Sequence, residues 1–245
     1  MSKFAILIAA AGGSTRFKDG YYKKPFAPLD GRAVWLHSAE RFVNRPDVCQ
    51  VIVIIAQEDR EEFDRRFAAN AMILGLEVCV GGKERIDSVA NGLAKVKEQA
   101  DFVAVHDAAR PCVAEKWIDQ VFSAAEKNGA AILATPITES LKRAGKASTI
   151  AETVDRTSLW VAQTPQVFRR ELLIEAYAKR KGPVTDDAQL VEQLGKPVTI
   201  VQGSPLNVKI TTKEDLRLAE QILKVLPKPK PEGFVHPFAG DDLWR

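Results

Sequence analysis

The sequence of 245 residues lacks any apolar run close to the roughly 20 residues that a membrane-spanning helix requires. It contains only three cysteines, Cys49, Cys79 and Cys112, whose spacing fits no metal-binding motif. An odd number of cysteines in and beside apolar runs is typical of buried, reduced thiols rather than of a disulfide framework. The first three residues lead into the apolar run Phe4–Ala11 without a signal-peptide cleavage pattern. We therefore expect a cytoplasmic protein that does not bind a membrane.

The sequence also lacks an excess of charge of one sign, because 35 Lys and Arg residues oppose 32 Asp and Glu residues. A net charge of +3 disfavours bulk nucleic-acid binding, although a local basic pocket for phosphates fits this balance. The fractions of 46% hydrophobic and 27% charged residues are those of an ordinary globular protein. We predict one large domain over residues 1–226, followed by a Pro/Lys linker and C-terminal tail over residues 227–245.

Short apolar runs alternate with helical patterns through the first two-thirds of the chain. The runs are continuously apolar, as expected for strands that are covered on both faces. Between them, apolar residues such as Ile86, Val89 and Leu93 recur at helical spacing. This alternation predicts an α/β fold with a doubly wound, mostly parallel, Rossmann-like sheet. The predicted strands are Phe4–Ala11, Gln50–Ala56, Glu77–Val80, Asp101–His106 and Ala130–Pro136.

The alternation ends after Pro136. The polar, β-branched stretch Ser140–Trp160 has no helical periodicity and predicts a protruding β-arm at about residues 138–160. A capping box at Thr212–Asp215 predicts the start of an amphipathic helix that ends near Leu226. Between the arm and this helix we predict a helix around Arg170–Lys179 and strands at Pro197–Gln202 and Asn207–Thr211.

Neither G-x-G-x-x-G nor G-x-x-x-x-G-K-[ST] follows the first strand, which argues against a dinucleotide site and a P-loop. The run Ala9–Arg16 instead places small residues at the strand's carboxyl end, where backbone N–H groups can bind phosphate. Arg16 and Lys24 add two cations to this region. Open α/β sheets bind ligands at this edge, so we predict a phosphate site there. A tight turn with two solvated basic side chains is the alternative.

A second polar cluster, His106–Pro111, ends another predicted strand and faces the same crevice. Asp107 suits Mg²⁺ or a substrate hydroxyl, and Arg110 suits a phosphate as a bidentate fork. An Asp–Arg pair on the surface is the alternative. His106 adjoins an apolar strand and has no partner nearby in the sequence, so we interpret it as structural.

Further polar residues are dispersed along the chain. They comprise Gly81–Ser88, Asp155-Arg156, Thr164-Pro165-Gln166, Thr185-Asp186 and Lys209. Each group alone is typical of a solvated surface, but together they offer basic and hydroxyl groups to an anionic substrate.

These motifs occur in the order seen in one family. The sequence resembles the 2-C-methyl-D-erythritol 4-phosphate cytidylyltransferases of the non-mevalonate isoprenoid pathway over about residues 3–226. His106–Pro111 and Thr153–Arg156 are fairly specific to that family, whereas the glycine loop is shared by many nucleotidyltransferases. The resemblance implies attack of a substrate phosphate oxygen on the α-phosphorus of Mg²⁺-CTP, with departure of pyrophosphate. It also implies a homodimer whose arm reaches into the neighbouring subunit.

The resemblance further implies roles for individual residues, without a general base. Arg16, Lys24 and Lys209 would stabilise charge on the phosphoryl oxygens as catalytic residues. The cytidine nucleotide would be held by Ala10, Ala11, Gly12, Gly13, Gly81, Gly82 and Ser88. The methylerythritol phosphate would contact Asp107, Arg110, Ser140, Arg156, Thr164 and Thr185, and Asp107 is also the candidate Mg²⁺ ligand.

The chain departs from the family's pattern at three places. Lys23-Lys24-Pro25 stands where Pro-Lys-Gln is usual; either lysine fits, and spacing to the apolar residues that follow favours Lys24. Lys83 follows the glycine pair where Asp is common, and Ser140 replaces the usual Thr.

Three alternative functions remain at this point. Ribitol-5-phosphate cytidylyltransferase catalyses the same reaction on another polyol, and the run Ala108-Ala109-Arg110 favours methylerythritol phosphate over ribitol phosphate. A non-catalytic nucleotide-sensing domain is disfavoured by the joint presence of Arg16, Lys24, Asp107 and Lys209. An NAD-binding oxidoreductase is disfavoured by the missing glycine fingerprint.

Overall fold

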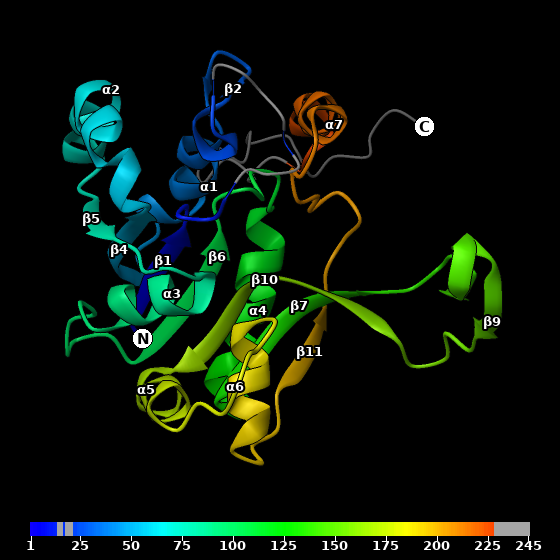
Figure 1. The fold of residues 1–245 in the computed structure, drawn as a ribbon. Helices are drawn as coiled ribbons and strands as arrows, with labels where there is room; N and C mark the ends of the chain where they lie inside the picture. Colours follow the sequence, from blue (N-terminus) through cyan, green and yellow to red (C-terminus); the bar gives the residue numbers. More distant parts are fainter. Residues whose placement is uncertain (14–16, 18–21, 228–245) are drawn as a thin grey trace, which may run out of the picture.

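The computed structural model describes residues 1–13, 17 and 22–227. Seven strands form its central sheet: β1 Phe4–Ala9, β4 Val48–Ile55, β5 Glu77–Val80, β6 Phe102–Asp107, β7 Ala130–Pro136, β10 Trp160–Arg169 and β11 Thr199–Gln202. Their order in the sheet is β11-β7-β10-β6-β1-β4-β5 (Figure 1). Neighbouring strands are parallel except at β10, which is antiparallel to β6 and β7. The expected mostly parallel α/β sheet is confirmed.

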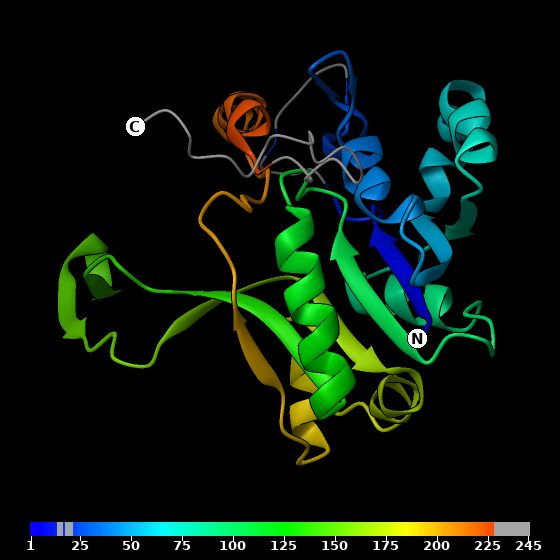
Figure 2. The same cartoon turned by 180° about the vertical axis from the view of Figure 1, so that it is seen from behind.

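Helices cover both faces of this sheet. On one face lie α1 Val34–Val43, α2 Arg60–Ile73 and α4 Glu115–Asn128. On the other lie α3 Arg85–Leu93, α5 Arg170–Ala178 and α6 Asp187–Gln193. Figures 1 and 2 show the molecule from opposite sides, with α3 and α5 nearer the viewer in Figure 1 and α4 nearer in Figure 2. No helix in this described part of the chain is both long and apolar enough to span a membrane.

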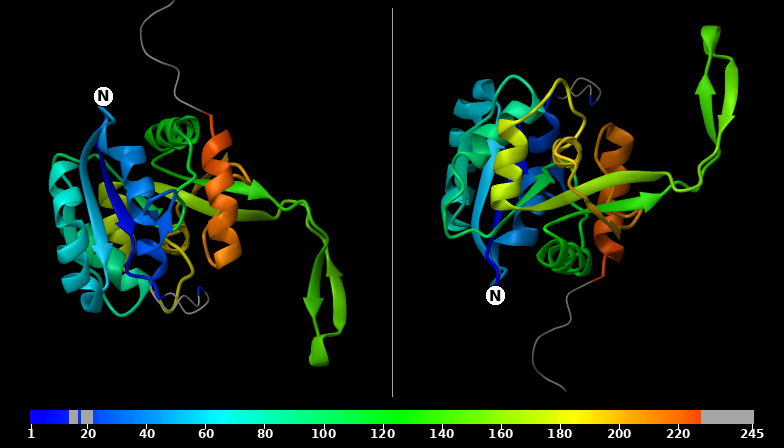
Figure 3. Two further views of the ribbon diagram at one scale, coloured as in Figure 1. Left: turned by 90° about the horizontal axis from the view of Figure 1, so that it is seen from above. Right: turned by 90° about the horizontal axis from the view of Figure 1, so that it is seen from below.

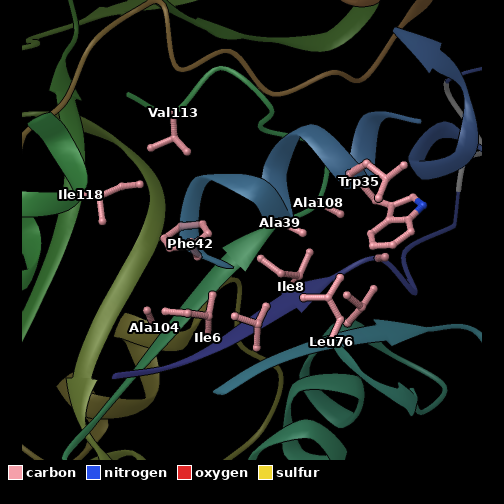
Figure 4. Close-up of a cluster of buried hydrophobic side chains, with 14 of the residues drawn as sticks. Ile6, Ile8, Trp35, Ala39, Phe42, Leu76, Ala104, Ala108, Val113 and Ile118 are labelled. Atoms are coloured by element: carbon pink, nitrogen blue, oxygen red, sulfur yellow. The ribbon is translucent and has the colours of Figure 1, made fainter. Parts of the chain in front are cut away.

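The strands are continuously apolar because each face packs against its own helices. In β1, Phe4, Ile6 and Ile8 pack with α1, α2 and α4, whereas Ala5 and Leu7 pack with α3 and its neighbours. Figure 4 shows the first cluster, in which Ile6 and Ile8 lie below the α1 side chains. Successive side chains of a strand point to opposite faces, so neither face of β1 is left for polar residues.

The predicted arm is present as a β-hairpin. Strands β8 Leu141–Ala144 and β9 Ile150–Val154 pair with each other, joined by the short 3₁₀ turn η3 Lys146–Ser148, and form a sheet separate from the central one. Figure 3 shows this hairpin projecting away from the body of the molecule. The exchange of the arm between two subunits stays a prediction.

The last helix, α7 Lys213–Val225, begins as predicted at a capping box. Thr212 Oγ1 accepts a hydrogen bond from the Asp215 N–H, and Asp215 Oδ2 accepts one from the Thr212 N–H at 2.8 Å. The helix packs against a third apolar cluster that includes Leu29, Cys112 and Ile210. The tail of residues 228–245 lies outside the described residues, so its separation from the domain stays a prediction.

The predicted strand Asn207–Thr211 is wrong. These residues form a loop, and two of their backbone groups bind the loop after β6 instead of joining a strand ladder. The Ile210 N–H donates to the Ala109 carbonyl at 2.8 Å, and the Asn207 carbonyl accepts from Arg110 Nη1 at 2.7 Å.

Several elements were not predicted from the sequence, among them α1, α2, α6 and β10. The shorter ones are η1 Lys24–Phe26, β2 Pro28–Leu29, β3 Arg32–Ala33 and η2 Gln57–Asp59.

Candidate active site

Two pockets open at the carboxyl ends of β1 and β6, which are adjacent parallel strands. The first pocket is lined by Ala9, Ala10, Ala11, Gly12, Lys24, Pro25, Arg85, Ser88, Asp107, Ala109 and Lys209. The second is lined by Arg85, Asp107, Arg110, Ala162, Gln163, Thr164, Gln166, Thr185, Asp186 and Lys209. Arg85, Asp107 and Lys209 line both, so the two pockets meet at these side chains. This is the edge at which open α/β sheets bind ligands.

The first pocket is built from closely packed backbone. A Cβ atom on Gly81 would lie 2.6 Å from Ser88 Oγ and 2.8 Å from Ala11 Cβ, and one on Gly82 would lie 2.5 Å from Asp87 Cβ. The glycine pair therefore allows the turn before α3 to pack against the end of β1. Ser88 Oγ accepts from the Gly82 N–H at 3.1 Å and fixes this turn. Ser88 lines the pocket, whereas Gly13, Gly81 and Gly82, which were also expected to hold the nucleotide, do not line it.

The two adjacent lysines have different surroundings. Lys23 Nζ lies 2.5 Å from Asp59 Oδ1 and 3.2 Å from Glu58 Oε1, so it pairs with η2 and lines neither pocket. Lys24 lines the first pocket. This difference supports the assignment of the catalytic role to Lys24. Arg16, the other cation expected there, lies outside the described residues.

Asp107 is surrounded by cations. Its Oδ2 lies 2.6 Å from Lys209 Nζ and 3.7 Å from Arg110 Nε, and its Oδ1 lies 3.4 Å from Arg85 Nε. Burial alone would raise the pKa of Asp107, but Arg85, Lys209 and Arg110 together hold it well below its usual value. The carboxylate is therefore ionised, with both oxygens in contact with protein cations.

This environment does not fit a Mg²⁺ ion held by Asp107. A protein-bound Mg²⁺ needs carboxylate or carbonyl oxygens in near-octahedral geometry, and three neighbouring cations would repel it. Across residues 1–13, 17 and 22–227, no three His, Cys, Asp or Glu side chains cluster in a way that could hold a metal. The geometry disfavours the metal role expected for Asp107 and favours its role as a partner of cations.

His106 is fully buried and hydrogen-bonded at both ring nitrogens. Its Nε2 lies 3.1 Å from the Arg110 carbonyl, and its Nδ1 lies 3.1 Å from Thr164 Oγ1. Because a carbonyl only accepts, Nε2 carries the proton, and Thr164 donates to Nδ1. Thr164 Oγ1 in turn accepts from the Asp107 N–H at 3.0 Å. The interpretation of His106 as structural is confirmed, and Thr164 lines the second pocket with its hydroxyl already bonded.

The loop after β6 is fixed by its backbone groups. The Ala108 carbonyl accepts from Ser38 Oγ at 2.8 Å, and the Ala109 carbonyl accepts from the Ile210 N–H at 2.8 Å. Together with His106, these bonds hold the segment that carries Asp107 and Arg110. These bonds therefore fix the backbone on one side of the second pocket.

Two expected substrate residues, Ser140 and Arg156, are not brought to either pocket. They flank the hairpin arm at its base, and Arg156 Nη1 donates to the Thr138 carbonyl. Both residues are exposed. Within one chain the structure therefore assembles only part of the expected site.

Sequence reasoning missed the importance of three side chains that lie at the second pocket. Arg85, Gln166 and Asp186 occur in the dispersed polar runs but carry no local feature that separates them from solvated residues. The sequence feature that could have identified Arg85 as a pocket residue is its position in the first turn of a helix, directly after the glycine pair.

Comparison with known proteins gives the same family as the motifs. The family model of 2-C-methyl-D-erythritol 4-phosphate cytidylyltransferase (IspD) matches residues 4–225. A relative of that name from Rhodopirellula baltica is 43% identical over 232 residues, covering 89% of this chain and 94% of the relative. Another from Bacillus velezensis is 42% identical over 226 residues, covering 91% and 96%. The chain belongs to the 2-C-methyl-D-erythritol 4-phosphate cytidylyltransferase family.

Solved structures of this family share the fold. A crystal structure described as 4-diphosphocytidyl-2C-methyl-D-erythritol synthase superposes with a TM-score of 0.76 at 31% identity, covering 91% of this chain and 99% of that one. The cytidylyltransferase from Thermus thermophilus gives a TM-score of 0.72 at 33% identity, covering 91% and 100%. The resemblance and fold class expected from the sequence are thereby confirmed for residues inside the family match.

The buried His106 predicts a specific dependence of stability on pH. Burial lowers the pKa of His106 from 6.5 to about 4, so between these values the unfolded chain binds a proton that the folded chain does not. Stability should therefore fall as pH drops through this window, with about 3 kcal/mol attributable to this group. Urea unfolding at several pH values measures it. His106→Gln should show a shallower slope, and an unchanged slope would contradict the prediction.

The different surroundings of the two lysines predict unequal effects on turnover. Lys24→Ala should lower turnover by about 10²-fold, because it removes a positioned cation from the first pocket. Lys23→Ala should have a much smaller effect, because Lys23 pairs with Asp59 and Glu58. Steady-state rates and melting temperatures of both variants test this. Greater loss of turnover in folded Lys23→Ala would move the catalytic role to Lys23.

Proposed function

We propose that the protein transfers the cytidylyl group from CTP to 2-C-methyl-D-erythritol 4-phosphate, giving the cytidine diphosphate of methylerythritol and pyrophosphate. Membership of the cytidylyltransferase family supports the reaction. The structural observation that carries the proposal is the pair of pockets that meet at Arg85, Asp107 and Lys209. Two substrates placed there would present their reacting groups to each other.

In this proposal the first pocket holds the nucleotide. The backbone of Ala10–Gly12 at the end of β1 and the side chain of Ser88 would bind CTP, and Lys24 would face its phosphates. The second pocket holds the polyol phosphate near Arg110 and Thr185. Lys209, which lines both pockets and is 42% exposed at its side chain, would contact the phosphoryl group in transfer.

The reaction would proceed by positioning and neutralisation of charge. A phosphate oxygen of the polyol attacks the α-phosphorus of CTP, a new P–O bond forms, and the bond to pyrophosphate breaks in line. The attacking phosphate is already ionised, so no side chain needs to remove a proton. Preorganised cations stabilise the charge that develops on the phosphoryl oxygens without reorganisation at the moment of reaction.

Magnesium remains in the proposal as part of the substrate. Mg²⁺ commonly binds to nucleotide phosphates while keeping several waters, and a site of this kind does not need a cluster of protein carboxylates. CTP would accordingly bind as its Mg²⁺ complex. Asp107 would stay with its three cations in this arrangement.

We further propose that the protein acts as a homodimer. Ser140 and Arg156 lie at the base of the arm and line neither pocket of their own chain. An arm that crosses a two-fold axis would bring both residues to the polyol phosphate of the neighbouring subunit. A cytoplasmic location is a prediction from the sequence alone.

The first test is substrate dependence. Pyrophosphate release should require CTP, 2-C-methyl-D-erythritol 4-phosphate and a divalent cation together. Each pocket would hold one substrate, and CTP would bind as its Mg²⁺ complex. The assay compares all four nucleoside triphosphates and both polyol phosphates. Equal or greater turnover with ribitol 5-phosphate would overturn the polyol assignment, and turnover in a chelator would overturn the role of magnesium.

The second test asks whether Arg156 serves the neighbouring subunit. Lys24→Ala and Arg156→Ala should each have only a small residual activity as homodimers, because each removes one cation from every site. After unfolding and refolding together, one site of every mixed dimer regains both residues, so about a quarter of all sites should recover. Mass spectrometry of the mixture verifies that mixed dimers form. Mixed dimers that remain inactive would place Arg156 in its own chain's site, whereas an active Arg156→Ala homodimer would place it outside catalysis.

A further inference from the structure

Arg85 occupies the boundary between the two pockets but contacts two carboxylates at once. Its Nε lies 3.4 Å from Asp107 Oδ1, and its Nη2 lies 2.9 Å from Asp187 Oδ2. The side chain of Arg85 is 29% exposed, that of Asp107 is 9% exposed, and that of Asp187 is completely buried. The Arg85 guanidinium therefore connects a buried carboxylate below the pockets to the carboxylate at their junction.

Asp187 has a strict requirement for this contact. Its Oδ1 accepts a hydrogen bond from the Tyr177 hydroxyl, while its Oδ2 accepts no well-aligned hydrogen bond from the described residues. A buried carboxylate without compensation is costly, so the ionic contact with Arg85 must hold Oδ2. Both Asp187 and Asp107 correspondingly raise the pKa of Arg85, although burial alone would lower it.

The contact also ties together two segments that are distant in sequence. Arg85 is the first residue of α3, directly after the turn of the glycine pair at the first pocket. Asp187 is the first residue of α6, directly after Thr185 and Asp186 at the second pocket. Gln166 Oε1 accepts from the Asp187 and Ala188 N–H groups at 3.1 and 3.0 Å, which fixes this end of α6 to the central sheet.

The charge balance separates Arg85 from the other cations of the site. Two carboxylates surround Arg85, so its charge is already compensated without a substrate. Lys209 and Arg110 share only the Asp107 carboxylate among the ion pairs of the described residues. An incoming phosphate would therefore pair with Lys209 and Arg110, while Arg85 stays paired with the two carboxylates of the protein.

We propose that Arg85 is a positioning residue, held in place by buried Asp187, which fixes the Asp107 carboxylate and thereby sets the geometry of both pockets. The proposal rests on the proposed function for the identity of the two substrates. Arg85 acts through Asp107 and through the α3 and α6 segments. A single change in this pair should therefore alter the handling of both substrates.

The central test uses Asp187→Asn, which keeps the shape of the side chain and removes its charge. We expect kcat/KM for each substrate to fall by about 10-fold to 100-fold, because small displacements of positioned groups have effects of this size. Calorimetric affinities for CTP and for the polyol phosphate, measured separately, should weaken as well. Arg180→Gln is the matched control, since Arg180 pairs with Asp87 of α3 at 3.0 Å at the surface. It should leave all these parameters unchanged.

A double variant decides whether Asp187 acts through Arg85. Arg85→Gln combined with Asp187→Asn should lower kcat/KM no further than Arg85→Gln alone, because the second change removes a partner that is already without function. Arg85→Lys should retain more activity than Arg85→Gln, since it keeps the charge but loses the fork. Losses that multiply in the double variant would overturn the proposal.

Stability measurements separate positioning from bracing. If the pair only braces the fold, Asp187→Asn will lower the melting temperature while the folded protein keeps wild-type affinities and rates, and the proposal is wrong. If Asp187→Asn does not fold, Arg85→Lys with the same measurements takes its place, and wild-type parameters there would equally overturn it. A wild-type protein without activity on CTP and methylerythritol phosphate would instead refute the proposed function, and the calorimetric affinities would still test Arg85.

Discussion

The negative charge of Asp107 allows three cations to gather at the carboxyl end of β6. Lys209, Arg110 and Arg85 come from three separate parts of the chain, and without a carboxylate between them their mutual repulsion would be large in a partly buried site. Because the cations outnumber the carboxylate, the junction of the two pockets keeps an excess of positive charge. That excess suits it to phosphate groups. The same contacts hold Asp107 ionised and make it a poor ligand for a metal ion.

This arrangement depends in turn on the neutral state of His106. An imidazole with its proton on Nε2 donates to the Arg110 carbonyl and accepts from Thr164, so one buried ring fixes both ends of the loop. In a protonated ring Nδ1 could no longer accept from Thr164, so this bond would have to reverse, and a positive charge would be buried close to Arg110 and Lys209. The position of the charged carboxylate thus rests on an uncharged neighbour. Burial beside α1, where His106 packs against Phe42, keeps that neighbour uncharged.

The sequence predicts a helix or strand correctly where one physical signal, such as a continuously apolar run, dominates that segment. The run of β7 was located with its correct ends because its first five residues are all buried, and the short run of β5 was located correctly because turn residues bound it, although only Cys79 of β5 is buried. The loop Asn207–Thr211 was mistaken for a strand because its apolar residues alternate, although its polar groups bind the loop after β6. Helix α2 was not predicted because its face toward the core is narrow. Only Phe63, Phe67 and Ala71 of this helix are buried, and polar residues lie between them.

The site was predictable to the extent that its residues follow strand ends. Asp107, Arg110 and the backbone of Ala10–Gly12 lie where a parallel sheet places ligands, and the sequence alone led to them. Arg85 and Asp187 could not be singled out in this way, because a charged residue in the first turn of a helix is usually solvated. Their importance comes from long-range packing, which brings the first turn of α3 against the first turn of α6. Local patterns therefore identify the polar groups that line the pockets at the strand ends, while ion pairs between distant segments, such as Arg85–Asp187, become visible only in the folded chain.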